Sequence, residues 1–473
     1  MPTILGANTL SSGYDVANSL RFNSADSARL TRTQTSGDRN KATFSAWVKR
    51  SELGANQGFF GIHGASSDAG QIEIRFQSSG EGFHISGHAT NWRRTSASFR
   101  DVSAWYHLVV AFDTTLSTAG DRVKVYVNGV QTTAFAASEN PDQDEDLPFG
   151  LNGATCSVGS DFNAGSAGNF FGGYLAEVVL IDGQQLDPTS FGEFDEDSPT
   201  IWKPKDVSGL TFGNNGFYLD FEDSSSLGND AAGSNNFTAT NTATTDQSTD
   251  TCTNNAITMN PLDDVASSTY SEGNLKVVTS ASGSAPHFAT FGLTRGKWYW
   301  EVKATSFTEH SAGYICIGIT GNQSNSNTGQ LGSLSGDYAF VNNGNIEAGT
   351  GNDTSYGNSY TQGQIIGTYL DLDNNKLYFS INGTLQNSGT GHSITAASST
   401  TNGFYMPSFS DYSSSSSNLV TVEWNFGAGT TFAISSGNTD GEYGNFEYST
   451  TITGDGASKT FKAINSKNLA EFG

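Results

Sequence analysis

Residues 369–386, YLDLDNNKLYFSINGTLQ, carry the pattern that decides the fold. Every second residue is apolar in the run Leu377, Phe379 and Ile381. A period of two indicates a β-strand with one face in a core and the other towards water. The pair Asn382-Gly383 follows directly, and Asn-Gly tolerates the positive φ angles that a tight hairpin turn requires. The stretch therefore predicts a β-hairpin at the edge of an antiparallel sheet.

A second stretch, HLVVAFDTT…DRVKVYVNGVQ (107–131), follows the same plan. Val123, Val125 and Val127 recur at every second position, and Asn128-Gly129 follows them. The repeat predicts the same kind of sheet edge at two places in the chain. Because one architecture can serve many functions, it does not predict a shared ligand.

Length and composition favour an all-β protein with more than one domain. At 473 residues the chain is too long for one ordinary core. The 55 glycines favour turns and short strands, and apolar residues at helical spacing are scarce. We expect two antiparallel, jelly-roll-like β-sandwich domains joined by a connector rich in Gly, Asn and Ser. Aromatic residues, 12% of the chain, can fill their cores.

Several classes of function are disfavoured. A net charge of −24 without a basic stripe predicts no nucleic-acid partner. Cys156, Cys252 and Cys316 lack the spacing of a zinc site or a disulfide framework. No run reaches the roughly 18 apolar residues of a membrane span, so we expect no membrane insertion. The start, MPTILGANTLSSGYDV, lacks the basic residues and long apolar run of a secretory signal.

The composition also suggests where the protein works. Only 15% of the residues are charged, so solubility must depend on hydroxyl and amide groups. This suits a salty exterior, where salt weakens charge interactions beyond about 10 Å. An exterior-type composition without an export signal is typical of virion proteins, which are assembled in the host cytoplasm and released by lysis. We therefore expect the chain to be exposed on a virus particle.

Strand-like runs recur in the first half, where ATFSAWVKR, WYHLVVAFD, VKVYVNGV and GYLAEVVLIDG follow one another. They contain Trp47, Trp105, the Asn128-Gly129 turn and Glu177. In this order and with these landmarks, the first half resembles laminin-G-like and pentraxin-like domains of the concanavalin A superfamily. The resemblance covers about 15–195 and implies a sandwich of two antiparallel sheets.

The second half contains a further series of strand-like runs, RGKWYWEVKA (295–304), GYICIGIT (313–320), YAFVNNGNI (338–346) and the strands of 363–383 and 403–427. Their order resembles that of a SPRY domain. The WYWE strand and the LDLD…FSING hairpin are the most specific of these motifs. The resemblance covers about 265–430.

Three stretches flank the second domain, GNNGFYLDFEDSSSLGNDAAGSNNFTATN and TATTDQSTDTCTNNAITMNPLDD before it and TFKAINSKNLAEFG after it. They resemble parts of structural proteins of marine tailed phages. The alternative for the first stretch is a flexible linker. Phe217, Leu219, Phe221 and Phe237 argue against it, because exposing them is costly.

These patterns predict five segments. They are an N-terminal arm that is a candidate docking segment (1–20), a laminin-G-like sandwich (21–195), a connector (196–265), a SPRY-like sandwich (266–435) and a C-terminal tail (436–473).

Signatures of catalysis are missing from the sequence. Glucanases of the superfamily use two carboxylates that flank the scissile bond, within the motif Glu-x-Asp-x-x-Glu. The closest text, EFDEDS, has Ser198 in place of the second glutamate. The histidines accompany no nucleophile elbow, and no phosphate-binding loop is present. We therefore expect no enzymatic activity, and glycan cleavage is the least favoured alternative.

Calcium is a candidate cofactor by resemblance. Laminin-G-like and pentraxin-like domains often bind this ion through oxygen atoms of their loops. Asp142, Asp144 and Asp146 alternate in one acidic loop. Asp161 stands where pentraxin-like domains place a calcium-ligating acid. The acidic loop has a second interpretation, a solvated run of charge.

Recognition of carbohydrate or protein is the favoured activity. A sugar site combines an aromatic platform with amides and carboxylates, and HATNWRRTS (88–96) offers Trp92, Arg93 and Arg94 in an expected loop. SPRY domains build their binding surface from loops, and the candidates in or near loops there are Tyr338, Asp353, Tyr356, Asp411 and Tyr412. The alternative for each is packing at the rim of a sandwich.

Together these features predict a phage virion structural protein, such as a fibre, a tip or a decoration. It would recognise a host-surface glycan or protein through many weak contacts, with copy number supplying avidity. Its partners would be other virion proteins, the host receptor and further copies of the same chain in a homo-oligomer. The alternative is a purely architectural capsid or tail component without a ligand.

Overall fold

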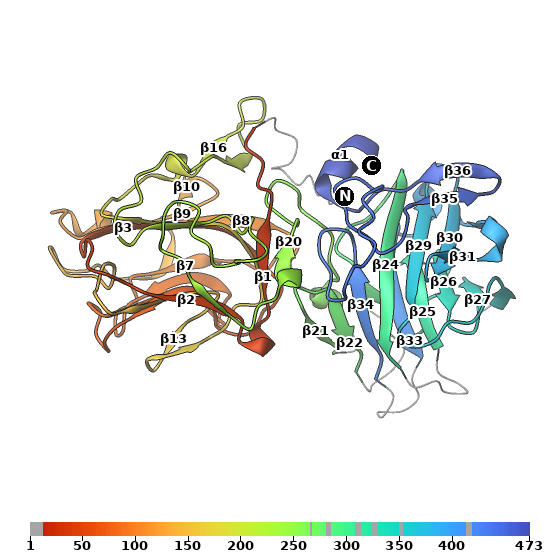
Figure 1. Cartoon of the computed structure of the whole chain (residues 1–473), viewed down its shortest axis with the longest axis horizontal. Helices are drawn as coiled ribbons and strands as arrows, with labels where there is room; N and C mark the ends of the chain where they lie inside the picture. Colours follow the sequence, from red (N-terminus) through yellow and green to blue (C-terminus); the bar gives the residue numbers. More distant parts are fainter. Residues whose placement is uncertain are drawn as a thin grey trace. The chain divides into compact units, whose positions relative to one another are not determined.

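The computed structural model describes residues 13–264, 267–280, 285–307, 314–323, 329–349, 353–412 and 419–473. The chain forms two compact units that meet in the sequence at Asn254 and Asn255. Antiparallel strands dominate both units (Figure 1), which confirms the predicted all-β class. Among the described residues, no helix is long and apolar enough to span a membrane.

The N-terminal unit is a sandwich of two sheets that lie face to face (Figure 1). Sheet 1 has the strand order β10-β9-β8-β3-β15-β1-β20, with β18 also paired to β15. Its strands are β1 Ser19–Phe22, β3 Lys41–Arg50, β8 Trp105–Asp113, β9 Val123–Val127, β10 Val130–Gln131, β15 Gly173–Asp182, β18 Phe217–Leu219 and β20 Gln247–Ser248.

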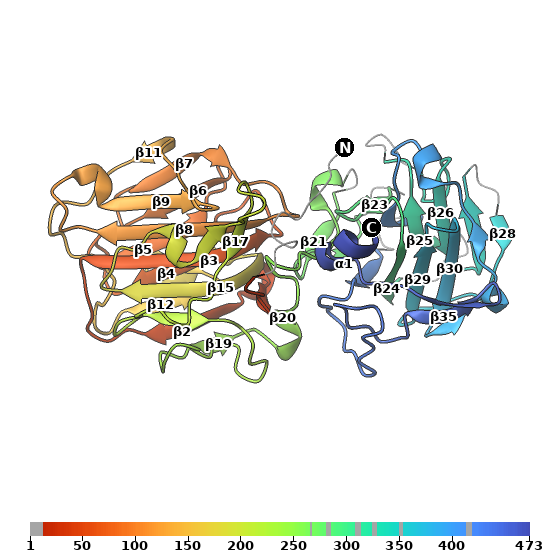
Figure 2. The same cartoon turned by 90° about the horizontal axis from the view of Figure 1, so that it is seen from above.

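Sheet 2 has the order β11-β7-β6-β5-β4-β12-β2-β19, and Figure 2 shows these strands in sequence from top to bottom. They are β2 Arg29–Thr33, β4 Gln57–His63, β5 Gln71–Phe76, β6 Gly82–Ser86, β7 Arg93–Ser98, β11 Phe135–Ser138, β12 Thr155–Val158 and β19 Thr238–Thr240. Two hairpins complete the unit, β13 Asp161–Asn163 with β14 Ser166–Gly168, and β16 Gly192–Phe194 with β17 Trp202–Pro204.

The C-terminal unit is a second sandwich. One sheet has the order β21-β22-β34-β24-β29-β30-β31, with β32 paired to β30, and the other has the order β23-β33-β25-β26-β27-β28. The first contains β21 Thr269–Ser271, β22 Lys276–Val278, β24 Lys297–Ser306, β29 Ile365–Asp371, β30 Lys376–Ile381, β31 Thr384–Leu385, β32 His392–Ser393 and β34 Thr421–Asn425. The second contains β23 His287–Phe288, β25 Tyr314–Thr320, β26 Asp337–Val341, β27 Asn345–Ala348, β28 Asp353–Ser355 and β33 Met406–Tyr412.

The remaining elements are short. They are the hairpin β35 Thr451–Gly454 with β36 Ala457–Thr460, the helix α1 Ser466–Phe472, and the 3-10 turns η1 Ser24–Asp26, η2 Ala119–Asp121, η3 Pro188–Ser190, η4 Thr244–Asp246, η5 Pro261–Asp263, η6 Asn387–Gly389 and η7 Ala397–Ser399.

Both predicted Asn-Gly hairpins are present and use the same device. Asn128 and Gly129 have φ values of 47° and 78°, and Asn382 and Gly383 have 45° and 75°. Each asparagine side chain also accepts a hydrogen bond from a backbone N–H of the neighbouring strand. Asn128 accepts from His107 at 2.8 Å, and Asn382 accepts from Ile365 at 2.9 Å. A type I′ turn needs positive φ at both central residues, so Asn-Gly fits.

The segment predicted as a connector, 196–265, is divided between the two units instead of lying between them. β18, β19 and β20 pair with β15, β2 and β1 of the N-terminal sandwich. Residues from Asn255 onward belong to the C-terminal unit, where the backbone of Ile257 donates to Ile464. The four apolar residues that argued against a linker, Phe217, Leu219, Phe221 and Phe237, are all buried in the N-terminal core.

A buried ion pair holds the end of this segment against the first sandwich. The Lys49 ammonium contacts the Asp250 carboxylate at 2.7 Å, and both side chains are almost fully buried. Trp105 donates its indole N–H to the same carboxylate at 3.0 Å. Of the predicted arm, residues 1–12 lie outside the described part, while Val16 donates to Thr253 at 3.1 Å. The N-terminal sandwich therefore extends from residue 13 to Asn254.

The predicted tail, 436–473, is also part of a sandwich. Phe446 and Phe461 pack on Tyr299, Tyr369 and Tyr378, which line the outer face of the sheet that contains β24, β29 and β30. The buried carboxylate of Glu301 accepts the backbone N–H groups that follow, those of Glu447 at 3.1 Å and Tyr448 at 2.8 Å. The tail covers an aromatic sheet face that would otherwise be exposed.

Candidate functional site

The outer face of sheet 2 gathers polar side chains from adjacent strands. The apolar residues of β5 point into the core, so Gln71, Glu73 and Arg75 lie on the opposite face. The register places Ser86 beside Glu73 and His84 beside Arg75. Arg94 of β7 lies opposite His84. We call Gln71, Glu73, Arg75, His84, Ser86 and Arg94 together the polar face.

Arg75 is at the centre of the polar face. Its Nη1 contacts Glu73 Oε2 at 2.5 Å and Asp161 Oδ2 at 3.0 Å. Gln71 donates to Glu73 Oε1 at 2.6 Å, and Ser86 donates to Glu73 Oε2 at 3.2 Å. One guanidinium group thus links two carboxylates, and hydroxyl and amide groups surround them.

The second carboxylate belongs to the β13–β14 hairpin. Asp161 is fully buried, and Asn169 donates to its Oδ1 at 2.8 Å. The pKa of Asp161 is raised to about 7, mainly by burial and in smaller part by Glu73, while Arg75 and Asn169 act in the opposite direction. The acid therefore ties the hairpin to the sheet and is not open to solvent.

Two glycines let this hairpin lie on the sheet. A Cβ at Gly58 would be 2.5 Å from the backbone nitrogen of Asp161, and one at Gly61 would be 2.9 Å from its Cα. Both distances are shorter than real Cβ contacts. Figure 1 shows β13 on the side of sheet 2 that faces away from sheet 1.

His84 and Arg94 extend the polar face towards β7. Burial, and then the charge of Arg75, lower the pKa of His84 to about 4, so its ring is neutral near pH 7. Its Nε2 lies 3.0 Å from Oδ1 of the exposed Asn91. Arg94 is half-buried and donates to Gln77 at 3.1 Å. His84 itself is buried, so at this rim Arg94 and the neighbouring Asn91 are the groups that reach solvent.

Of the ligand residues predicted in the N-terminal half, the structure places only Arg94 on the polar face. Trp92 is fully buried and lies edge-on to Phe112, with ring centroids 5.8 Å apart. Arg93 is buried and donates to Asn140 at 2.8 Å. The sequence could not show this, because the second part of the expected loop, from Arg93, is strand β7, and Trp92 just before it is buried in the core.

The candidates in the C-terminal unit also differ in their surroundings. Tyr338 and Tyr356 belong to the hydrophobic core, which favours the packing alternative for both. Asp411 is buried and accepts a hydrogen bond from Thr279 at 2.8 Å. Asp353 is exposed on β28. Tyr412 ends β33, and its side chain lies outside the described part.

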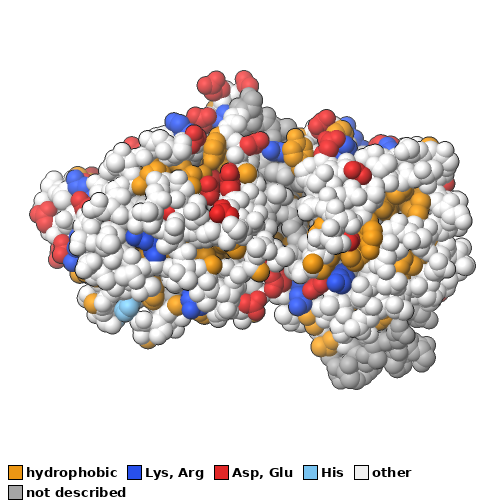
Figure 3. All heavy atoms as spheres, viewed as in Figure 1, with side chains coloured by type: hydrophobic (Ala, Val, Ile, Leu, Met, Phe, Trp, Pro, Cys, Tyr) orange, Lys and Arg blue, Asp and Glu red, His pale blue; other side chains and the backbone are white. Residues whose placement is uncertain are grey.

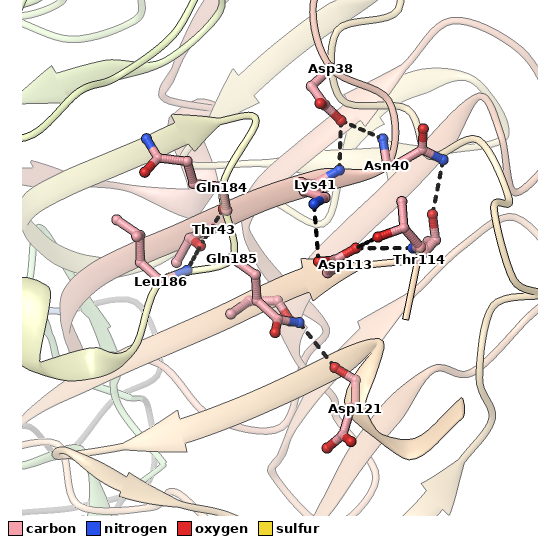
Figure 4. A network of polar contacts seen from close by, with 12 residues as sticks. Asp38, Asn40, Lys41, Thr43, Asp113, Thr114, Asp121, Gln184, Gln185 and Leu186 are labelled. Atoms are coloured by element: carbon pink, nitrogen blue, oxygen red, sulfur yellow. Dashed lines mark hydrogen bonds and ion pairs between the residues drawn. The ribbon is translucent and has the colours of Figure 1, made fainter. Parts of the chain in front are cut away.

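The predicted calcium ligands do not come together. Asp142 and Asp144 are exposed, and Asp146 pairs with Arg39 at 3.1 Å. Their loop is fastened at Glu145, whose carbonyl accepts from Asn40 and Thr114. Figure 4 shows Asn40 and Thr114 in a network that also includes Asp38, Lys41 and Asp113.

Asp161 is a poor calcium ligand for a separate reason. Its carboxylate already carries the guanidinium of Arg75, which a calcium ion would have to displace. Within the described ranges, no three His, Cys, Asp or Glu residues form a group that could hold a metal ion. The four predicted acids therefore do not fit one calcium site.

Gln71, Glu73, His84 and Ser86 of the polar face are buried, and Gln71 and Ser86 donate to Glu73 within it. The groups that a ligand could reach are Arg94 and the neighbouring Asn91 at the rim. Sequence reasoning missed Gln71, Glu73 and Arg75, although a signal was present. In QIEIRF the apolar residues alternate with these three, so they had to share the other face of the strand. That β13 would add Asp161 to them could not be inferred from local pattern.

The comparisons agree with the architecture. Residues 16–186 match the family model described as the concanavalin A-like lectin/glucanases superfamily, and residues 297–419 match the SPRY domain model. No match to the chain is found among curated proteins.

Similar solved structures exist for each half. The SPRY domain of human HERC1 has 15% identity and a TM-score of 0.26, and the match covers 34% of this chain and 91% of that one. The SAP-like pentraxin of Limulus polyphemus has 16% identity and a TM-score of 0.29, with 37% and 80% covered. Domain 4 of the arabinanase AbnA of Geobacillus stearothermophilus, solved with arabinotriose, has 22% identity and a TM-score of 0.24, with 32% and 65% covered. By its family models, this chain carries a laminin-G-like domain of the concanavalin A-like lectin superfamily and a SPRY domain.

Proposed function

We propose that the chain is a surface protein of a phage virion that recognises glycans through the polar face of its laminin-G-like domain. The observation that carries the recognition part is the rim of the polar face, where Arg94 and the neighbouring Asn91 reach solvent beside the hydrogen-bonded network around Arg75. Such groups suit sugar hydroxyls, which both donate and accept. Binding at one face would be weak, and many copies on a particle would supply avidity.

The virion part of the proposal has separate support. It rests on the resemblance of the segments before and after the SPRY domain to parts of phage structural proteins, and on an acidic composition with few charged residues. Its direct test is mass spectrometry of virus particles purified from the lysate of cells in which the chain is made. Absence of the chain from purified particles would reject the virion assignment without affecting glycan binding.

We propose binding without catalysis. A glycosidase places the scissile bond between two carboxyl groups. At the polar face the guanidinium of Arg75 already lies between Glu73 and Asp161, and Asp161 is buried. Release of reducing ends from a bound glycan would contradict this part.

The test of recognition is a glycan array probed with the purified full chain and two matched variants. Arg94→Ala removes a half-buried cation from the rim of the polar face, while Lys124→Ala removes one from β9 of sheet 1. We expect Arg94→Ala to weaken binding by tenfold or more, and Lys124→Ala to leave it unchanged. Equal loss in both variants would place the site elsewhere. No binding by the folded protein would favour the architectural alternative.

A further inference from the structure

A second group of acids lies in the C-terminal unit, on β27 and β28. Glu347 of β27 and Asp353 of β28 are directly opposite in the antiparallel register. Side chains at such positions have Cβ atoms about 4.5–5.5 Å apart and point to the same face. On the neighbouring strand β26, Ala339 is paired with Glu347, and it packs with Cys316 on the outer side of the sheet. The two carboxylates therefore face each other on the outer face.

Glu347 has an acceptor atom without a donor. Glu347 is 5% exposed, and its Oε2 atom is buried with no hydrogen-bond partner among the described residues. Gln330 donates to the other oxygen, Oε1. Burial and then Asp353 raise the pKa of Glu347, to about 7, and only Gln330 acts against this. A buried carboxylate that faces a second carboxylate needs a proton or a cation between them.

The backbone of Gly332 packs closely against Glu347. Gly332 has a φ of 103°, and a Cβ there would lie 2.5 Å from Glu347 Cβ and 3.1 Å from Oε2. A side chain at this position would clash with Glu347, so glycine is needed beside the unpartnered oxygen. Asp353 is exposed, so the pair can be reached from solvent.

We propose that Glu347 and Asp353 bind a hard divalent cation of the calcium class. Gln330 can supply its amide oxygen after rotation of the amide, and water completes the shell. Calcium takes six to eight oxygen ligands, and sites with few carboxylates in extracellular modules bind it at about 10⁻⁴–10⁻³ M. The site is independent of glycan recognition, because it lies in the other unit.

The experiment is a calcium titration of the chelator-treated full chain by isothermal calorimetry. Glu347→Gln and Asp353→Asn each remove one charged ligand, and the latter residue is exposed, so that variant tests the site with little risk to folding. Glu423→Gln on β34 of the other sheet removes one acid of the same unit as the control. We expect a tenfold or greater rise in Kd in the first two variants and none in the control.

Two results would overturn the proposal. One is the absence of saturable calcium binding by the folded wild-type chain up to about ten times the expected Kd. That result, together with stability that depends on pH in the wild type but not in Glu347→Gln, would show that a shared proton joins the carboxylates. The other is calcium binding that both site variants leave unchanged, which would place the ion elsewhere.

Discussion

Removing residues 196–254 should unfold the N-terminal sandwich, although the family model ends at residue 186. The segment supplies Phe217, Leu219, Phe221 and Phe237 to the core, with exposed fractions of 0%, 0%, 2% and 7%. Burial of such a side chain contributes about 1.5–3 kcal/mol, so the four together contribute about 6–12 kcal/mol. A domain of this kind has a total stability of about 5–15 kcal/mol. The loss therefore matches the whole free energy of unfolding.

Loss of the segment also removes the carboxylate of Asp250 from the buried ammonium of Lys49. Breaking a buried ion pair by removing one partner costs about 3–5 kcal/mol more. The assay is urea unfolding of fragments 13–195 and 13–254, followed by circular dichroism and tryptophan fluorescence. We expect a cooperative transition for the longer fragment and none for the shorter one. Cooperative unfolding of fragment 13–195 at a similar urea concentration would refute the assignment of 196–254 to this core.

Three further outcomes are expected. Trp202→Phe removes the indole N–H that donates to His107 Nδ1 at 2.9 Å, and urea unfolding should show a loss of about 1–3 kcal/mol; an unchanged midpoint would contradict this. Glu301→Gln places an amide N–H₂ among the donors that now bind this carboxylate, so limited proteolysis should release the 436–473 tail faster than in the wild type. Burial raises the pKa of Glu177 to about 8, although the hydrogen bonds of Tyr218 lower it. The resulting contribution of protonated Glu177 to stability is complete below about pH 4.5 and is lost as the pH rises through 8. Urea unfolding at pH 5 and pH 8 should therefore show a smaller difference for Glu177→Gln than for the wild type, and an equal difference would refute the role of Glu177.

Histidine burial produces pH dependence of the opposite sign. Burial lowers the pKa of His107 to about 3, and its Nε2 lies 2.9 Å from the Ser45 hydroxyl. A depressed histidine pKa contributes stability that is present above about pH 6.5 and is lost as the pH falls towards 3. The sequence could suggest a strand histidine at this position, but not that Trp202, 95 residues later, would hold its Nδ1.

Local pattern was sufficient for the strands and turns. The alternation in residues 376–381 and 123–127 predicts strands, and the Asn-Gly pairs predict turns, because side-chain period and φ preference depend only on neighbouring residues. The same alternation would have been sufficient to place Gln71, Glu73 and Arg75 on one face of β5. These inferences need no contact between distant parts of the chain.

Contacts between distant residues decided the rest. Which side chains reach Arg75 depends on β13, whose Asp161 is 86 residues away. Trp92, the residue before β7, is buried in the core against residues from distant strands. Likewise Glu347 faces Asp353 only through the register of β27 and β28. The composition of 196–254 resembles a linker, yet its few aromatic residues bury enough apolar surface to join the first core. By itself the sequence determined the strands, the turns and the all-β class; the tertiary structure decided the domain boundary and the two acid clusters, because burial and pairing across the chain are not encoded in local periodicity.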